Sequence, residues 1–372
     1  MHLAIDALPI NNFSGRAVLR GHLRNLANAG RGRHQFTIFH HAANNDLREE
    51  LGEHVRFHCC PVGSGWIGRI AWQSFQFDRI LRSIRADAVL STSGALIPNI
   101  GIPQWVFAQN PWCFFSNFHR GSERLKAWLQ RRGYREAQRK AQAIFYLSDY
   151  MRRLYGKNAK GAVAAGATIY VGVDQDYFRL AQQTPPPAYE ERPCEVLTVS
   201  VMTPHKSIED IIAAFAILRA RGVDASLRLV GPWATPVYRK RIESMIRLRG
   251  LDNCISIEGH LSRLELACAY KRARVFCLLS RCESFGIPAV EAQVFGTPTV
   301  VADVCAPPEI AGPGGKIVAE GDSVAAAAAL TQLLTNEDAW KTASRDAFAN
   351  AQRFHWDNLS RPIVDMMNGW QP

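Results

Sequence analysis

The chain of 372 residues has few of the features that mark a metal site, a membrane span or a secreted fold. Its nine cysteines form no CxxC pair and no cysteine-histidine cluster of zinc spacing, which excludes the common structural zinc modules. Scattered cysteines of this kind indicate a reducing compartment, so we expect a cytoplasmic protein. No window approaches the roughly 18 to 20 consecutive apolar residues of a transmembrane helix. The first residues also lack the pattern of a secretory signal.

Acidic residues are scarce in the first half of the chain. Residues 1–180 contain 24 Lys and Arg against 12 Asp and Glu, whereas residues 181–372 contain 20 against 21. A basic half suggests an anionic partner, either a membrane face or nucleic acid, and a solvated basic surface is the simpler alternative. No Gly-x-Gly-x-x-Gly follows the first apolar run, which weakens the case for a dehydrogenase.

The sequence does contain an alternation of short apolar runs with helix-like stretches. The first half has the runs HLAID, QFTIFHH, VRFHCC, DAVLST, QWVFAQ and AIFYLS, and the second has EVLTVSV, ASLRLVG, CISIEG, ARVFCLL and PTVVAD. Short apolar runs between helices predict the buried strands of a parallel sheet. A chain of 372 residues is too long for one typical core and fits two domains of ordinary size. We therefore expect an α/β protein of two Rossmann-like, doubly wound domains that face each other across a cleft, where such sheets bind ligands.

A Pro-rich polar stretch, AQQTPPPAYEERP, separates the two alternations. We expect the first domain to cover residues 1–182, a linker to cover 183–193, and the second domain to cover 194–353.

The segment RCESFGIPAVEAQVFGTPTVV, residues 281–301, carries two carboxylates eight positions apart, Glu283 and Glu291. Gly286 permits an unusual backbone turn and Pro288 suits the first position of a helix, whose first turn would hold Glu291. A helix N-terminus attracts phosphate, and carboxylates accept hydrogen bonds from hydroxyls. A nucleotide sugar, with hydroxyls on both sides of a diphosphate, has that layout. A capped helix with two incidental surface acids is the alternative.

This segment resembles the Glu-x7-Glu motif of retaining GT-B glycosyltransferases, particularly glycosyltransferase family 4. VSVMTPHKSIEDIIAAFAIL is similar to the phosphate-lysine segment of that family, and ISIEGHLSRLELACAYKRARVFCLLS is similar to the run that precedes the motif. AIDALPINNFSGRAVLRGHLRNLA resembles the strand, loop and helix that open these enzymes, and VGVDQDYF resembles the end of their first domain. The resemblance implies a GT-B fold in which residues 354–372 form a helix that crosses back to the first domain.

The resemblance also implies roles for individual residues. Glu283 would hydrogen-bond the transferred sugar and Lys206 would neutralise the diphosphate, so these two are the predicted catalytic residues. Glu291 would hold the ribose. The remaining predicted donor contacts are Ser284, Phe285, Gly286, Ile287 and Gly15.

Two positions depart from the family pattern. Val201 stands where the family often has Arg, so either a second cation comes from elsewhere, with His205 and Arg281 as candidates, or the diphosphate is held by fewer charges. Gln109 and Asn110 stand on the acceptor side where many members carry a His, and their amides can bind sugar hydroxyls but cannot act as a base.

The resemblance implies a retaining transfer of a hexose from a GDP- or UDP-sugar, with mannose from GDP-mannose favoured, to a glycan or lipid-linked acceptor in bacterial cell-surface polysaccharide synthesis. We expect no metal or other cofactor, because the Asp174-Gln175-Asp176 triplet near the domain junction matches a structural turn and His40-His41 has no third ligand. Two alternatives remain open. One is a sugar-nucleotide-binding protein without transfer activity, motivated by Val201 and Gln109, and the other is a nucleic-acid-binding protein.

Residues 119–141, HRGSERLKAWLQRRGYREAQRKA, combine a high positive charge with interleaved Leu125, Trp128, Leu129 and Tyr134. This pattern is typical of a basic amphipathic surface helix, so we expect the first domain to rest on an anionic membrane through residues that include Arg131, Arg132 and Arg135. In the alternative, the apolar side chains pack into the domain and the arginines are only solvated.

Overall fold

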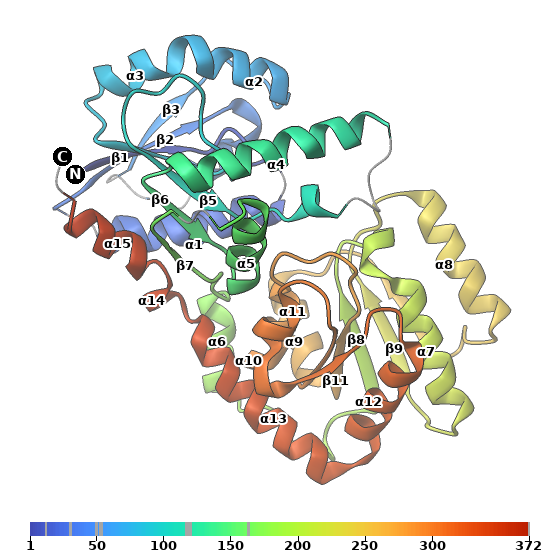
Figure 1. Cartoon of the computed structure of the whole chain (residues 1–372). Coiled ribbons are helices and arrows are strands. Elements are labelled where there is room, and N and C mark those ends of the chain that lie inside the picture. The colour runs from blue at the N-terminus through green and yellow to red at the C-terminus, as the bar shows by residue number, and fades with distance from the viewer. Residues whose placement is uncertain are drawn as a thin grey trace. The chain divides into compact units, whose positions relative to one another are not determined.

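The computed structural model describes residues 1–11, 13–29, 32–48, 51, 55–115, 121–161 and 164–370. It forms two compact units (Figure 1). The first unit contains Met1–Gly172 and the chain from Trp356 onwards, and the second contains Val173–His355.

The first unit is built on a parallel sheet in the order β3-β2-β1-β4-β5-β6-β7. Its strands are β1 His2–Asp6, β2 Gln35–His40, β3 Val55–Cys59, β4 Ala88–Ser91, β5 Gln104–Ala108, β6 Ala143–Tyr146 and β7 Gly166–Thr168. Its helices are α1 Phe13–Ala29, α2 Trp66–Trp72, α3 Asp78–Ser83, α4 Ser122–Lys140, α5 Asp149–Asn158, α14 Trp356–Leu359 and α15 Arg361–Asn368. Helices α2 and α3 cover one face of the sheet, whereas α1 and α15 lie on the other (Figure 1). Because both faces are covered, the central strands are buried apolar runs.

The second unit has a parallel sheet in the order β10-β9-β8-β11-β12-β13. Its strands are β8 Glu195–Val199, β9 Ser226–Val230, β10 Ile255–Glu258, β11 Val275–Leu278, β12 Thr299–Ala302 and β13 Gly315–Val318. Its helices are α6 Gln175–Gln183, α7 Ile208–Ala220, α8 Pro236–Leu248, α9 Arg263–Arg272, α10 Ile287–Val294, α11 Pro307–Ala311, α12 Ser323–Thr335 and α13 Glu337–Ala351. Side chains of α7, α8 and α12 form one core with alternate strand residues such as Val196 and Cys277. The strand residues between them, such as Phe276, face α9 on the other side.

The two Rossmann-like units agree with the predicted fold class, and each of the eleven predicted runs contains a strand. The domain boundary differs from the predicted one. The chain passes between the units at Gly172–Val173, so α6 belongs to the second unit, where Tyr177 packs against Tyr270 and Phe295. The Pro-rich stretch is not a free linker either, because it ends at the fully buried Arg192.

The end of the chain belongs to the first unit. The ring of Trp356 lies 5.0 Å from that of His22 and fills the space beside Gly21 and Gly172, where added Cβ atoms would lie 2.0 and 2.3 Å from the indole. Among the described residues, no helix combines the length and the apolar content that crossing a bilayer requires.

Candidate functional site

The carboxyl ends of β8 and β11 bring together two of the predicted site residues. The strands are neighbours in the sheet, and the backbone N–H of Arg281 donates to the carbonyl of His205 at 2.8 Å. This hydrogen bond joins the two loops. Lys206 Nζ consequently forms an ion pair with Glu283 Oε2, although the residues are 77 positions apart. Both side chains are mostly buried, at 17 and 14 % exposure.

The local backbone explains how these loops are shaped. Lys206 ends a short 3₁₀ turn, and Ser207 then adopts a left-handed φ of 51° at the start of α7. Gly286, with φ 94°, turns the chain into α10, where Pro288 occupies the first turn. A φ in this range is favourable for glycine and costly for other residues, so the predicted backbone turn at Gly286 is confirmed. Glu291 is the fifth residue of α10, so the expectation that it lies in the first turn is wrong by one residue.

Glu283 is held in its ionised form. Burial alone would raise the pKa of this carboxyl, but the charge and hydrogen bond of Lys206, with the backbone N–H of Phe285, outweigh burial and lower the pKa. The site therefore contains a fixed carboxylate acceptor and a fixed cation in contact.

Glu291, in contrast, is shifted towards its protonated form. Its Oε2 accepts a hydrogen bond of 2.7 Å from the Tyr270 hydroxyl. Burial is the largest influence and, with the charge of Asp174, raises the pKa of Glu291 to about 7 in spite of that bond. Tyr270 was not predicted as a site residue, although it lies in the run ISIEGHLSRLELACAYKRARVFCLLS that resembles the family.

Three of the remaining predicted donor contacts, Ser284, Phe285 and Ile287, lie in or next to the same loop. Phe285 is buried and packs edge-to-face on Phe354 with ring centroids 5.7 Å apart, so its backbone rather than its side chain faces Glu283. Ser284 and Ile287 flank it and are partly buried. The buried Oγ atoms of Ser207 and Ser280 have no hydrogen-bond partner within the described structure, and sequence reasoning missed both.

The two residues considered as a second cation are engaged in other ways. Arg281 forms an ion pair with Asp210 at 3.0 Å. His205 contacts Thr203 Oγ1 at 3.0 Å, and burial together with the charge of Lys206 lowers its pKa, which favours the neutral imidazole. Val201 is 53 % exposed. Lys206 is therefore the cation that contacts Glu283 directly.

The Asp-x-Asp triplet has a structural explanation. Asp174 caps α6 by accepting a hydrogen bond from the Asp176 N–H at 3.0 Å. Arg263 forms ion pairs with both carboxylates, at 3.1 and 2.9 Å. These contacts occupy the oxygens that a metal would need.

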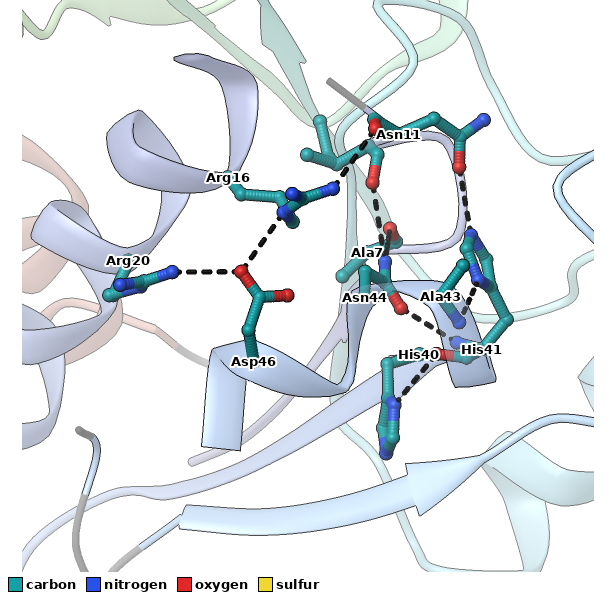
Figure 2. A network of polar contacts seen from close by, with 10 residues as sticks. Ala7, Asn11, Arg16, Arg20, His40, His41, Ala43, Asn44 and Asp46 are labelled. Atoms are coloured by element: carbon teal, nitrogen blue, oxygen red, sulfur yellow. Dashed lines mark hydrogen bonds and ion pairs between the residues drawn. The ribbon is translucent and has the colours of Figure 1, made fainter. Parts of the chain in front are cut away.

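In the first unit, the loops after β1 and β2 are joined by a polar network (Figure 2). Asn44 Nδ2 donates to the carbonyls of Ala7 and Ile10 at 2.9 and 3.3 Å. Arg16 and Arg20, one helical turn apart on α1, share Asp46 at 3.0 Å each. Gly15 lies inside the first turn of α1, not in the loop where it was expected, because the helix begins at Phe13.

The adjacent histidines belong to this network (Figure 2). The backbone N–H of Ala43 donates to His41 Nδ1 at 3.1 Å, so the proton of His41 must be on Nε2, which donates to Asn11 Oδ1 at 2.8 Å. Both ring nitrogens of His41 are thus occupied. His40 Nδ1 contacts the carbonyl of His41 at 3.2 Å. Burial lowers the pKa of each imidazole. No group of three potential metal ligands occurs among the described side chains.

Gln109 and Asn110 follow β5, at the carboxyl edge where ligands of parallel sheets bind. Gln109 donates to the carbonyl of Thr92 at 3.2 Å, and Asn110 Oδ1 accepts from the Trp112 N–H at 2.9 Å. These bonds orient both amides.

Helix α4 presents apolar side chains to solvent. Leu125, Trp128 and Leu129 are 62, 51 and 43 % exposed, so they do not pack into the domain. Tyr134 does not share that surface, because it is buried and stacks on Tyr155 with centroids 4.7 Å apart.

The arginines of α4 are not equivalent. Arg132 is exposed and lies over the Trp128 ring at 5.9 Å. Arg131 and Arg135 are partly buried, and Arg135 donates to the carbonyl of Asn158 at 3.0 Å. His119 and Arg120, which begin the predicted basic segment, lie outside the described residues.

Comparisons with known proteins agree with the fold. Residues 182–353 match the family model of the glycosyl transferases group 1, and residues 19–172 match that of the glycosyl transferase 4-like domain. O-antigen chain mannosyltransferase B of Escherichia coli is 28% identical over 173 residues, which are 45% of this chain and 44% of that protein. The chain thus spans less than half the length of this curated relative.

Solved structures match almost the whole chain. Sucrose-phosphate synthase from Thermosynechococcus elongatus has a TM-score of 0.78 at 17% identity and covers 99% of this chain and 98% of its own. HepE of Anabaena, in complex with UDP and glucose, has a TM-score of 0.72 at 19% identity and covers all of both chains. The chain therefore belongs to the group 1 glycosyltransferases, also called family 4, and has their GT-B fold of two Rossmann-like units.

Proposed function

We propose that the protein is a retaining hexosyltransferase whose donor is a nucleotide sugar. The observation that carries this proposal is the contact of Lys206 with Glu283 beside the N-terminus of α10, with Glu291 eight positions further along the chain. The arrangement supplies a cation and helix N–H groups for a diphosphate, and carboxylates for hydroxyl groups on either side of it.

Each group has a part in the reaction. When the glycosidic bond to the diphosphate breaks, negative charge grows on the leaving oxygen, and Lys206 and the N–H groups at the start of α10 stabilise that charge. Glu283, ionised by its contact with Lys206, accepts hydrogen bonds from the sugar hydroxyls. When the donor binds, Lys206 gives up part of its contact with Glu283 and contacts the phosphate instead. Retention assisted by the donor phosphate needs no base on the acceptor side, which is compatible with Gln109.

The proposed donor is GDP-mannose, and the proposed acceptor is a glycan or a lipid-linked glycan of a bacterial surface polysaccharide. The mannosyltransferase name of the Escherichia coli relative supports the sugar. UDP in the HepE complex supports a nucleoside diphosphate site and makes UDP-sugars the necessary comparison. Stabilisation of the protein against heat by GDP, UDP and their sugars would rank the donors directly.

Three substitutions test the donor site. We expect Glu283→Ala to lower kcat on the order of 10²-fold or more, because the sugar hydroxyls change environment in the transition state. Glu291→Ala should mainly weaken nucleotide binding, by about tenfold, since the ribose does not change during transfer. Lys206→Ala should reduce both. Steady-state kinetics and calorimetric titration with the nucleotide measure these effects.

Glu243→Ala on α8, which removes an exposed helix ion pair with Arg239, is the matched control and should behave as the native enzyme. Full turnover in the Glu283→Ala variant would refute the assignment. Donor binding without transfer or donor hydrolysis in the native chain would favour the alternative of an inactive sugar-nucleotide-binding protein, for which Val201 is the supporting observation.

We also propose that the reaction needs no divalent metal. Arg263 already pairs with both Asp174 and Asp176, so the leaving diphosphate would depend on Lys206 and α10. Activity should therefore persist in EDTA at the level measured without it. Loss of activity in EDTA, with recovery on adding Mn²⁺, would contradict this proposal and make Asp174 a candidate metal ligand.

We propose, finally, that the first unit docks on an anionic membrane through α4, from which a lipid-linked acceptor would be reached. The exposed Leu125, Trp128 and Leu129 next to Arg132 support this proposal.

A further inference from the structure

Two cysteines lie beside the proposed donor site, and nothing in the proposed reaction uses them. Cys282 immediately precedes Glu283 in the loop after β11, and Cys305 lies in the loop after β12. The two strands are neighbours in the sheet. The Ala306 N–H approaches the Glu283 carbonyl at 3.5 Å, so the backbones of the two loops also meet at this point.

The two side chains are in contact. Their thiol groups are hydrogen-bonded to each other, and both residues are partly buried. Cys305 has a left-handed φ of 63°, which is unfavourable for a residue with a Cβ atom. Strained backbone of this kind concentrates at functional sites. The fold thus holds Cys305 in a conformation natural for glycine, with its sulfur against Cys282.

We propose that Cys282 and Cys305 are a modification site, at which a peroxide oxidises the two thiols to a disulfide that ties the Glu283 loop to the loop after β12. One sulfur, as thiolate, attacks an oxygen of hydrogen peroxide and becomes a sulfenic acid, releasing hydroxide, which takes up a proton to become water. The second thiol displaces the sulfenic oxygen as a second water. Two thiols and one peroxide therefore give one disulfide and two waters.

The geometry of the two loops favours this bond. A disulfide has an S–S length of about 2.05 Å, and the backbone contact between the loops already keeps the two residues close. The hydrogen bond to Cys305 and burial raise the pKa of Cys282, so at neutral pH Cys282 is a thiol and acts as the second sulfur, the one that displaces the sulfenic oxygen.

The consequence for the protein rests on the proposed function. Formation of the disulfide pulls Cys282 towards Cys305, and Cys282 is the residue next to Glu283. Glu283 is held in place by its ion pair with Lys206, so this movement would disturb that pair. We therefore expect the disulfide to weaken the binding of a nucleoside diphosphate and reduction to restore it. The formation of the disulfide itself does not depend on what the site binds.

Peptide mapping tests the chemistry. The reduced chain is treated with hydrogen peroxide, remaining thiols are alkylated, and the unreduced digest is analysed by mass spectrometry. We expect a cross-linked peptide pair containing Cys282 and Cys305, two hydrogens lighter than the sum of its parts, that disappears with dithiothreitol. Cys268→Ser, which removes an exposed cysteine, should still give the pair, whereas Cys282→Ser and Cys305→Ser should not. Absence of the pair from the native chain overturns the proposal.

Thermal stabilisation by UDP and by GDP, measured before and after peroxide, tests the consequence. The native protein should lose most of the stabilisation on oxidation, while the Cys305→Ser variant keeps it. An equal loss in Cys305→Ser would overturn the effect on binding. If neither nucleotide stabilises the reduced protein, the proposed function fails, and the peptide map still decides whether the disulfide forms.

Discussion

Glu283 and Glu291 belong to one loop and helix, yet their surroundings shift their pKa values in opposite directions. Lys206 lowers the pKa of the first, whereas burial raises that of the second to about 7. Glu283 is consequently a permanent carboxylate, and Glu291 changes its protonation state near neutrality. A proton on Glu291 would remove part of its capacity to accept hydrogen bonds from the ribose hydroxyls of the proposed donor.

We therefore predict that nucleotide binding strengthens with pH through the titration of Glu291. Between pH 6 and pH 8 the ionised fraction of a group with a pKa of about 7 rises about tenfold, and the affinity for UDP or GDP should rise by up to that factor. Calorimetric titration of the native protein and of Glu291→Gln, which cannot ionise, measures the effect. The same slope in both proteins would show that Glu291 is not responsible.

The raised pKa of Glu291 also predicts how the stability of the protein depends on pH. A carboxyl with a raised folded pKa keeps a proton that the unfolded chain has already released, so its contribution to stability is present at low pH and is lost as the pH rises from about 4.5 through 7. Relative to Glu291→Gln, the native chain should become less stable over that range in urea unfolding. A difference that stays constant with pH would contradict the raised pKa.

At the scale of elements, helix α10 is fixed at both ends. Gly286 turns the chain into its first residue, and Arg192 holds its end. The Arg192 guanidinium donates to the carbonyls of Phe295 at the end of α10 and Ala273 at the end of α9, at 2.6 and 2.7 Å, and to Thr297 Oγ1 at 2.6 Å. A cation at helix C-termini is favourable for the helix dipole.

Arg192 should consequently be a major source of stability in the second unit. Arg192→Met removes donors from buried carbonyls and should cost about 3 kcal/mol or more, and Arg192→Lys should also destabilise because one ammonium cannot replace the planar fork. Burial lowers the pKa of Arg192 to about 9, so the group is still charged at neutral pH. Urea unfolding measures the loss.

Arg272→Met is the matched control, because that side chain is 59 % exposed and its ion pair with Glu195 is long, at 3.5 Å. We expect a change smaller than 1 kcal/mol for this variant. Equal stabilities of Arg192→Met and the native chain would mean that the buried guanidinium contributes nothing net.

At the scale of the molecule, the excess of positive charge lies in the residues that build the first sheet and its helices. Helix α4 combines that charge with an exposed apolar face, which is unusual for a helix that packs against a sheet. Each cation near an anionic surface adds on the order of 1 kcal/mol, so several together support reversible binding.

We predict that the protein sediments with anionic vesicles at low salt, is released at high salt, and stays in the supernatant with neutral vesicles. Trp128→Ala combined with Arg132→Glu should remove most of the binding, because both side chains are exposed. Lys240→Glu on α8 of the second unit is the control for charge alone. Recovery in the supernatant under every condition would leave α4 as a basic surface without a membrane role.

Much of the fold could be predicted because the central strands of parallel sheets are buried on both faces and must be apolar. β1 and β12 are examples, and all of their residues are buried. The two strands that were missed, β7 and β13, lie at sheet edges, where few residues are fully buried and the sequences GAT and GKIV carry no long apolar run.

By itself, the sequence determined the turn into α10, because Gly286 and Pro288 act on the backbone within their own turn. Only the tertiary structure decided which group faces each carboxylate. Lys206 meets Glu283 across 77 residues because β8 and β11 are neighbours, and such pairings leave no local trace. It also decided that Tyr134 is buried and Trp128 exposed on the same helix, since helical spacing defines the faces but not which face meets the protein.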